Sequence, residues 1–201
     1  MSITSVTINS KPLQEFMHQL HGAPSEPRYL HAIGKAVATV VKVHLQKKDA
    51  AEPNKLGGPR EHYYAKAASA TSWSVDERGV VVSVSQVGIN LHYHGGTVRP
   101  TEKKALAIPI SPLSKGTTAR DFERSTGLQM FKLPSKKGKP ETIGILAVQF
   151  DDHIEGVYVL RRSSKHAPDP TVLPKKSAMR GAAIRAIQRL AARDFAGGGN
   201  S

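Results

Sequence analysis

The segment from Lys175 to Phe195 constrains the fold most, because it has the clearest helical periodicity in the chain. Its apolar residues recur at the spacing of one helix face and are Met179, Ala183, Ala186, Ile187 and Leu190. Three arginines spaced by four form a stripe roughly opposite that face: Arg185, Arg189 and Arg193. Glycines end the helix, and we expect a flexible tail over residues 196–201. Other parts of the chain must therefore cover one side of a long helix.

Two further helices are predicted near the N-terminus. In the first, from Ser10 to Leu20, a polar cap precedes apolar residues at helical spacing, which are Leu13, Phe16, Met17 and Leu20. The second runs from about Arg28 to Lys48, after a stretch rich in Gly and Pro. Its apolar side comprises Leu30, Ile33, Val37, Val40, Val41 and His44, and its polar side comprises Lys35, Thr39, Lys42 and Gln46. We expect one face of this helix in the core and the other in water.

Strand patterns fill the middle of the chain. Thr71 to Val75 and Val80 to Ser85 predict a β-hairpin, with the alternate valines of the second strand on one face. A further strand is predicted at Ala105 to Ile110. A strand pair is predicted at Thr142 to Phe150 and Gly156 to Leu160, joined by a polar turn. Because the connections are short, the sheet is expected to be mostly antiparallel.

Residues 111–139 have little periodicity and are rich in Lys, Arg, Ser, Thr, Gly and Pro, which predicts a long surface loop. The wider window from Arg99 to Glu141 holds ten Lys and Arg against four Asp and Glu. Together these patterns predict one α+β domain over residues 1–195. It has two N-terminal helices, an antiparallel sheet of about five strands, a C-terminal helix packed on one sheet face and a projecting basic loop at about 111–139.

The overall charge favours acidic partners. Lys and Arg number 29 against 16 Asp and Glu, for a formal net charge of +13, so nucleic acid, acidic protein and anionic lipid are all candidates. The absence of cysteine excludes disulfides, thiol catalysis and cysteine-ligated metal sites. We find neither an apolar run long enough for a membrane span nor a secretory signal, and we expect a soluble cytosolic protein with no membrane partner.

No motif favours an enzyme or a cofactor. His92 and His94, two residues apart in a segment predicted to be extended, point the same way and could share a metal, but no third ligand is evident. The cluster Asp151-Asp152-His153 lies where a hairpin needs turn residues. A phosphate loop at residues 56–60 fails because Pro59 lacks an amide hydrogen. A histidine-based metallohydrolase stays an alternative on His92 and His94.

A nucleic-acid-binding module is a second alternative. From Arg161 to Arg193 there are nine Lys and Arg against one acid, Asp169, which could neutralise phosphates without reading bases. Aromatic residues make up only 5% of the chain, and the strands show no stacking platform. The same charges would equally serve an assembly protein that binds acidic neighbours, and composition does not separate these functions.

Three stretches carry a family resemblance. They run from Asn54 to Arg60, followed by Tyr63 and Tyr64, then from His94 to Pro100 and from Lys103 to Pro109. Their order and spacing resemble the virion morphogenesis proteins of tailed bacteriophages, a group of tail-completion and neck components of Mu-like and related siphophages. In that group a Gly-Gly turn leads into a strand that ends in proline. The resemblance covers residues 28–110 best and the C-terminal helix loosely.

The resemblance implies a structural virion protein at the head-tail junction, and no enzyme. We expect a closed ring, a hexamer or dodecamer, that joins the capsid to the tail as a neck, connector or tail-completion component. Its partners would be neighbouring portal, connector or tail-tube proteins, with non-specific contact to passing DNA. It would reside in the virion and, during assembly, in the host cytoplasm. The residues expected to shape the turn are His94, Gly95, Gly96 and Pro100, and those expected to supply charge are Lys136, Lys137, Lys139, Arg185, Arg189 and Arg193.

Overall fold

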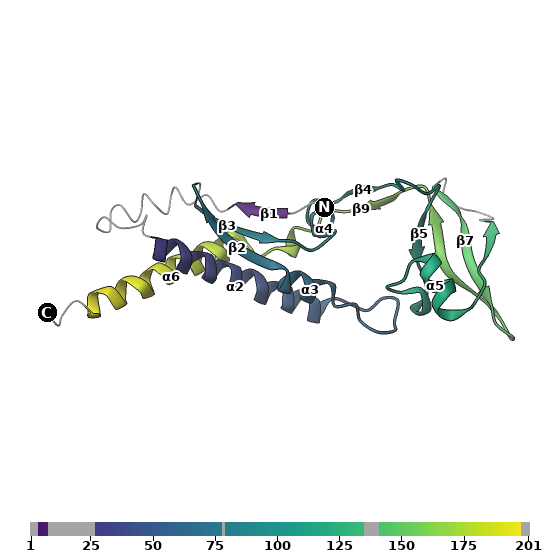
Figure 1. The fold of residues 1–201 in the computed structure, drawn as a ribbon, viewed down its shortest axis with the longest axis horizontal. Helices are drawn as coiled ribbons and strands as arrows, with labels where there is room; N and C mark the ends of the chain where they lie inside the picture. The colour runs from purple at the N-terminus through teal and green to yellow at the C-terminus, as the bar shows by residue number, and fades with distance from the viewer. Residues whose placement is uncertain (1–3, 8–26, 78, 135–140, 198–201) are drawn as a thin grey trace. The chain divides into compact units, whose positions relative to one another are not determined.

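The computed structural model describes residues 4–7, 27–77, 79–134 and 141–197, and it divides into two compact units (Figure 1). Unit 1 comprises the described parts of residues 1–51, 62–94 and 168–201. Unit 2 comprises those of residues 52–61 and 95–167. The chain therefore passes between the units four times, and neither unit is continuous in sequence. The expectation of one domain did not anticipate this division.

Unit 1 combines helices with a three-stranded antiparallel sheet of order β1-β3-β2. Its strands are β1 (Thr4–Thr7), β2 (Thr71–Asp76) and β3 (Gly79–Val84), and its helices are α2 (Pro27–Ala51), α3 (Tyr63–Ser69), α4 (Ile89–His94), the 3-10 turn η2 (Pro170–Val172) and α6 (Lys176–Gly197). The helices predicted at residues 28–48 and 175–195 are confirmed as α2 and α6. The predicted hairpin is confirmed as β2 and β3.

Helix α2 is the central element of unit 1, because it contacts α6, α3, β2 and β3. Its buried residues occupy more than one stripe, as Ile33, Val37 and Val41 are joined by Ala38 and Leu45 on an adjacent line. A helix with so wide an apolar face can pack against the strands β2 and β3 and against another helix at the same time. This explains why α6 packs against α2, whereas we expected the C-terminal helix to cover a sheet face.

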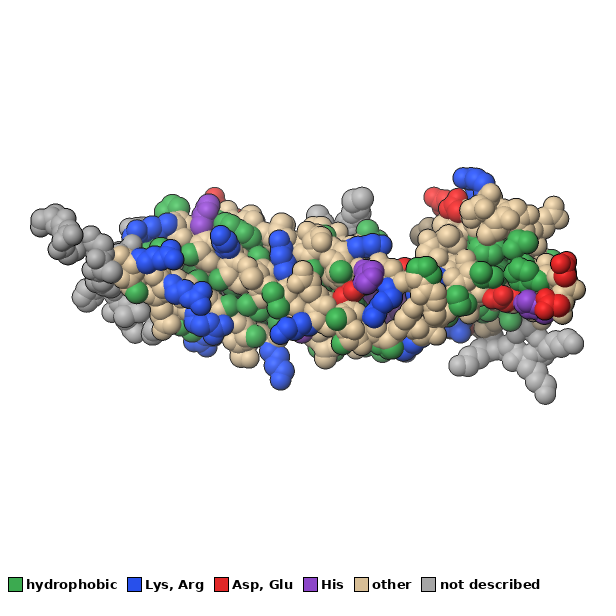
Figure 2. Space-filling model, turned by 90° about the horizontal axis from the view of Figure 1, so that it is seen from below, with side chains coloured by type: hydrophobic (Ala, Val, Ile, Leu, Met, Phe, Trp, Pro, Cys, Tyr) green, Lys and Arg blue, Asp and Glu red, His purple; other side chains and the backbone are tan. Residues whose placement is uncertain are grey.

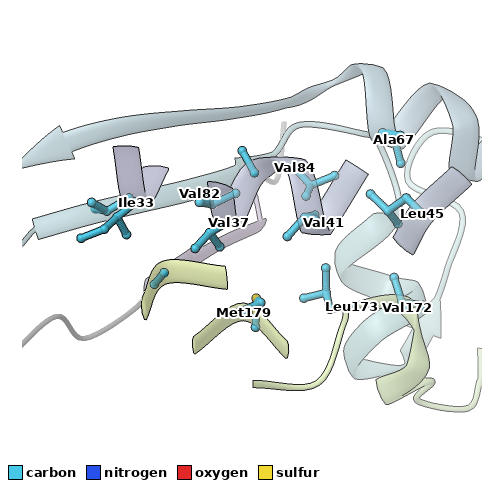
Figure 3. Packing of buried hydrophobic residues seen from close by; sticks show 14 of the residues in the cluster. Ile33, Val37, Val41, Leu45, Ala67, Val82, Val84, Val172, Leu173 and Met179 are labelled. Carbon is cyan, nitrogen blue, oxygen red and sulfur yellow. The ribbon is translucent and has the colours of Figure 1, made fainter. Parts of the chain in front are cut away.

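The core of unit 1 joins these elements (Figure 3). The labelled side chains come from α2, α3, β3, η2 with the following Leu173, and α6; in this one buried cluster Val37 and Val41 of α2 lie between Val84 of β3 and Met179 of α6, and Leu45 lies near Ala67 of α3. The alternate valines of β3, at positions 80, 82 and 84, are each 2% exposed, which confirms the predicted buried face. Burial of aliphatic side chains at about 2 kcal/mol each is the main force that holds the unit together.

One glycine permits a close approach within this core. An added Cβ at Gly34 of α2 would lie 2.3 Å from Cε3 of Trp73 in β2. Any larger side chain there would force the indole or the helix to move. Gly34 therefore sets how closely α2 can approach the hairpin.

Unit 2 contains a four-stranded antiparallel sheet of order β5-β8-β7-β6 and a two-stranded sheet of β4 and β9. The bounds are β4 (Gly96–Val98), β5 (Leu106–Pro109), the 3-10 turn η1 (Pro112–Ser114), α5 (Ala119–Thr126), β6 (Phe131–Pro134), β7 (Thr142–Gln149), β8 (Ile154–Arg161) and β9 (Ser164–His166). The strands predicted at 105–110, 142–150 and 156–160 are confirmed as β5, β7 and β8. The α+β class and the antiparallel pairing are thus as expected, but the strands form three small sheets and not one.

The predicted long loop at 111–139 is wrong for the residues that the structure describes there. The segment contains η1, α5 and β6, and Phe122 of α5 is 1% exposed and packs edge to face on Tyr158, with ring centroids 6.0 Å apart. Thr118 caps the start of α5 and Gly127, at φ 69°, ends it. A helix of eight residues with one buried aromatic side chain has no repeating apolar pattern, so it could not be recognised as a helix from the sequence.

Several expectations fall outside the described residues. These are the N-terminal helix at 10–20, the charged residues Lys136, Lys137 and Lys139, and residues 198–201 of the expected tail. None of the described helices combines the length and the apolar character that a membrane crossing demands.

Candidate functional site

A groove between α2 and α6 hollows the surface of unit 1 and has a volume of about 470 Å³. Its floor consists of small and aliphatic side chains, namely Ala32, Ala36 and Val40 of α2 with Ala182, Ala186 and Leu190 of α6. Its polar lining consists of Lys35, Thr39, Arg185, Arg189 and Arg193. Figure 2 shows Lys and Arg side chains gathered over the part of unit 1 that these two helices form.

The hollow follows from a repeat of alanines on both helices. In α2, Ala32 and Ala36 lie one helical turn apart, and in α6, Ala182 and Ala186 do the same. An alanine ends at Cβ, so each pair leaves space that a larger side chain would fill. The groove is therefore encoded by small residues at a spacing of four, a weak signal that sequence reasoning missed.

The cations at the groove have no neutralising partner among the residues that the structure describes. Lys35, Arg185, Arg189 and Arg193 are exposed, and among the described residues none of their side chains makes a hydrogen bond or an ion pair. Like charges four residues apart on a helix repel each other by about 0.2–0.5 kcal/mol per pair. The arginine stripe of α6 thus slightly destabilises its own helix, and an acidic partner would relieve that repulsion.

The position of this stripe corrects one expectation. We expected the three arginines roughly opposite the apolar side of the helix, but the structure places them at the groove beside Ala182 and Ala186. The reason is that the apolar face of α6 has a buried centre at Met179, Ala183 and Ile187 and a half-open flank at the groove. The stripe borders that flank, so charge and apolar surface meet in one place.

The two histidines considered as metal ligands do not form a joint site. The expected extended segment is the helix α4, in which residues two apart point in nearly opposite directions. His92 hydrogen bonds through Nδ1 with the hydroxyl of Tyr64 at 3.2 Å and stacks on Tyr63 with centroids 4.7 Å apart, while His94 is exposed. Across the described part of the chain, no group of three His, Cys, Asp or Glu side chains is placed to hold a metal ion.

The Gly-Gly turn has the expected backbone but a different place. Gly95 and Gly96 have φ of 70° and 145°, values that an L side chain rarely adopts. We expected them between two strands, but they connect the end of α4 to β4. A glycine with positive φ directly after a helix is a common way to end it. Pro100 lies half-buried after β4.

A network of paired polar side chains was not predicted from the sequence either. Asp49, near the end of α2, accepts hydrogen bonds from the backbone N–H groups of Tyr64 at 3.1 Å and Ala65 at 3.2 Å. It also accepts one from Nδ1 of His62 at 2.8 Å, and His62 itself has a left-handed φ of 50°. Burial raises the pKa of Asp49, but these hydrogen bonds outweigh it and lower the pKa below its ordinary value. Asp49 therefore caps α3, as a carboxylate does at a helix N-terminus.

A second carboxylate extends this network. Asp169 accepts from Nζ of Lys48 at 2.9 Å and from the backbone N–H of Thr171 at 2.9 Å, and the Thr171 hydroxyl also donates to it. The hydrogen bonds from the Thr171 and Lys48 side chains lower the pKa of Asp169 to about 2. The backbone N–H of Asp169 donates to the carbonyl of His92 at 2.9 Å. We call Lys48, Asp49, His62, Tyr64, His92, Asp169 and Thr171 the junction network, because its members flank the four places where the chain leaves or enters unit 1.

The other motifs weighed in the sequence occupy turns. Asp151-Asp152-His153 lies between β7 and β8, as expected for turn residues. The loop at residues 54–60 has left-handed backbone at Gly57 and Gly58, with φ of 73° and 64°. The side-chain amide of Asn54 donates to the carbonyl of Gly58 at 2.7 Å. These contacts give the loop a structural role.

The groove is thus the site in unit 1 at which charge, hollow shape and apolar surface coincide. Compared with known proteins, the chain matches no protein-family model, no curated protein and no solved structure.

Proposed function

We propose that this chain is a structural protein of the head-tail junction of a tailed bacteriophage. As a neck, connector or tail-completion component, it would form a closed ring that joins the capsid to the tail and lets DNA pass. The resemblance that suggests this function covers residues 28–110 across both units, and its three motif stretches lie mostly in unit 2, which holds the loop at 54–60, residues 95–100 and the segment at 103–109 that contains β5. Its role would be docking, without covalent chemistry.

The observation that carries the proposal is the groove of unit 1. Its alanine floor gains free energy when covered by apolar atoms, and its unpaired cations gain when they meet carboxylates. Protein interfaces combine these two kinds of surface, an apolar centre with charged groups at the rim. The groove therefore fits an assembly protein, whose main task is to hold neighbours.

The test combines mass and location. Native mass spectrometry of the purified protein is expected to give a closed oligomer of the 21.7 kDa subunit, a hexamer or dodecamer. Antibody labelling of intact particles, viewed by electron microscopy, is expected to mark the junction between head and tail. Particles that lack the protein, or that carry it at another position, would contradict the proposal.

Sequence-nonspecific DNA binding is the second candidate, and the exposed arginine stripe favours it. Three arginines at a spacing of four, without an ion pair among the described residues, could contact successive phosphates. On this alternative, the isolated subunit binds duplex DNA, and its affinity falls steeply between about 50 mM and about 200 mM salt. The alanine floor adds nothing to phosphate contacts, which is why we rank this function second.

A further inference from the structure

The groove calls for a partner that offers carboxylates beside an apolar side chain, and this chain presents such an element itself. The β7–β8 turn, by which we mean residues 150–155 including the first two residues of β8, carries Asp151, Asp152 and Glu155 and no Lys or Arg. Ile154 in the same turn is 53% exposed, although it is a large aliphatic residue. Figure 2 shows a group of Asp and Glu side chains with a His at the right edge of unit 2.

The turn is braced from within. The backbone N–H of Phe150 donates to the carbonyl of His153 at 2.8 Å, and the two rings stack with centroids 4.9 Å apart. The side-chain amide of Gln149 donates to the carbonyl of Phe150 at 2.6 Å. The side chain of Asp152 stays 85% exposed, with Nδ1 of His153 at 2.6 Å from one oxygen. A braced turn loses little conformational entropy when it binds.

We propose that the β7–β8 turn of one copy docks in the α2–α6 groove of a second copy. This proposal rests on the proposed ring of identical subunits. In this contact Asp151 and Asp152 face the arginine stripe, and Ile154 covers the alanine floor. The groove belongs to unit 1 and the turn to unit 2, so the contact joins two different surfaces. A contact of this kind repeats from copy to copy and yields a ring when its rotation closes.

Charge explains why this turn is favoured over other surfaces. With a net charge of +13, copies of the chain repel each other at long range, so an attractive contact needs a local concentration of acid. The other acidic turn, Asp76-Glu77 between β2 and β3, is followed directly by Arg78, which reduces its net negative charge. The β7–β8 turn has no such neighbour and adds the exposed Ile154.

A charge swap tests the contact. One variant carries Asp151→Arg with Asp152→Arg, and the other carries Arg185→Glu with Arg189→Glu. In each variant alone, the turn and the groove carry charges of the same sign. Each is therefore expected to self-associate at least about tenfold more weakly than the wild type in analytical ultracentrifugation. Mixed in equal amounts, the two variants are expected to regain association, because each groove then meets a turn of opposite charge.

A matched control separates this effect from net charge. Glu77→Lys with Glu102→Lys changes the charge as much as the arginine variant of the turn, at exposed positions elsewhere. This control is expected to associate nearly as the wild type does. Oligomers that persist in both swap variants, or a mixture that fails to regain association, would overturn the docking contact while leaving the proposed ring intact.

Crosslinking gives a second, positional test, because the chain has no cysteine of its own. A copy with Ala36→Cys in the groove is mixed with a copy carrying Ile154→Cys in the turn and treated with a short bismaleimide. Mixed dimers are expected in high yield, whereas Val87→Cys, at an exposed position of unit 1 outside the groove, should give few. Equal yields from the two positions would overturn the contact. The location of the protein in particles tests the proposed function separately.

Discussion

The groove and the junction network are both polar regions of unit 1, yet they use charge in opposite ways. In the network, Lys48 pairs with Asp169 at 2.9 Å and His62 pairs with Asp49 at 2.8 Å. At the groove, Arg185, Arg189 and Arg193 have no such partner among the described residues. The paired charges stabilise the fold, and the unpaired ones are available to another molecule. Stability measurements should therefore respond to the first region, and association measurements to the second.

The largest expected effect on stability comes from Asp49→Ala. The change removes the acceptor for two backbone N–H groups of α3 and for His62, so we expect a loss of about 2 kcal/mol in the free energy of unfolding. Urea denaturation followed by circular dichroism measures it. Asp49→Asn, which keeps one acceptor oxygen, should lose less. An unchanged denaturation midpoint in the alanine variant would show that the network is not what stabilises this end of unit 1.

A smaller loss is expected for Tyr64→Phe. Tyr64 is 4% exposed, and the substitution deletes only its hydroxyl, which hydrogen bonds with Nδ1 of His92 at 3.2 Å. We expect the free energy of unfolding to fall by about 1 kcal/mol, the usual net contribution of one hydrogen bond. Tyr93→Phe provides the comparison, because Tyr93 is a half-buried tyrosine of the same unit whose hydroxyl makes no hydrogen bond to a described residue. Equal losses in the two variants would mean that the His92 contact contributes nothing specific.

Acid should weaken the network through Asp169. Its pKa falls from an ordinary 3.8 to about 2 in the folded protein, so the pairing contributes fully above about pH 4 and is lost as the pH falls through about 2. We expect the denaturation midpoint of the wild type to drop over that window more than the midpoint of Asp169→Asn. Parallel pH profiles for the two proteins would contradict the assignment.

The smallest effect on stability is expected at the groove. Replacing Arg185, Arg189 and Arg193 together by Ala should change the free energy of unfolding by no more than about 0.5 kcal/mol per residue, because these side chains are exposed and make no hydrogen bond or ion pair with a described residue. Removal of their mutual repulsion could even raise stability slightly. Thermal melts of the monomer measure this. A large destabilisation would show that the three arginines stabilise the folded subunit itself, which would contradict a role limited to binding a partner.

The sequence was informative where one element buries a regular stripe. The periodicity of α2 and α6 and the alternating valines of β3 predicted these elements correctly. Prediction failed where the signal was a small or solitary residue. Phe122 is the one buried residue among the described residues of α5, and the groove depends on alanines that look like ordinary helix residues.

The junction network shows a second limit of sequence reasoning. Asp49 and His62 are separated by a loop of unit 2, and Lys48 and Asp169 lie 121 positions apart. Such pairs become neighbours only through tertiary structure, so local patterns contain no trace of them. The same holds for the division into two units, because short crossings of the chain look like ordinary loops.

The interrupted course of the chain has a consequence for synthesis. On the ribosome, α2 emerges early and α6 emerges last among the described elements, with residues 95–167 of unit 2 between them. Unit 2 can close while unit 1 still lacks its final helix. Until α6 arrives, the side of α2 that it covers stays open to water or to chaperones, and the groove does not yet exist. If the proposed contact forms, a nascent copy displays its acidic turn before its own groove can receive the turn of another copy.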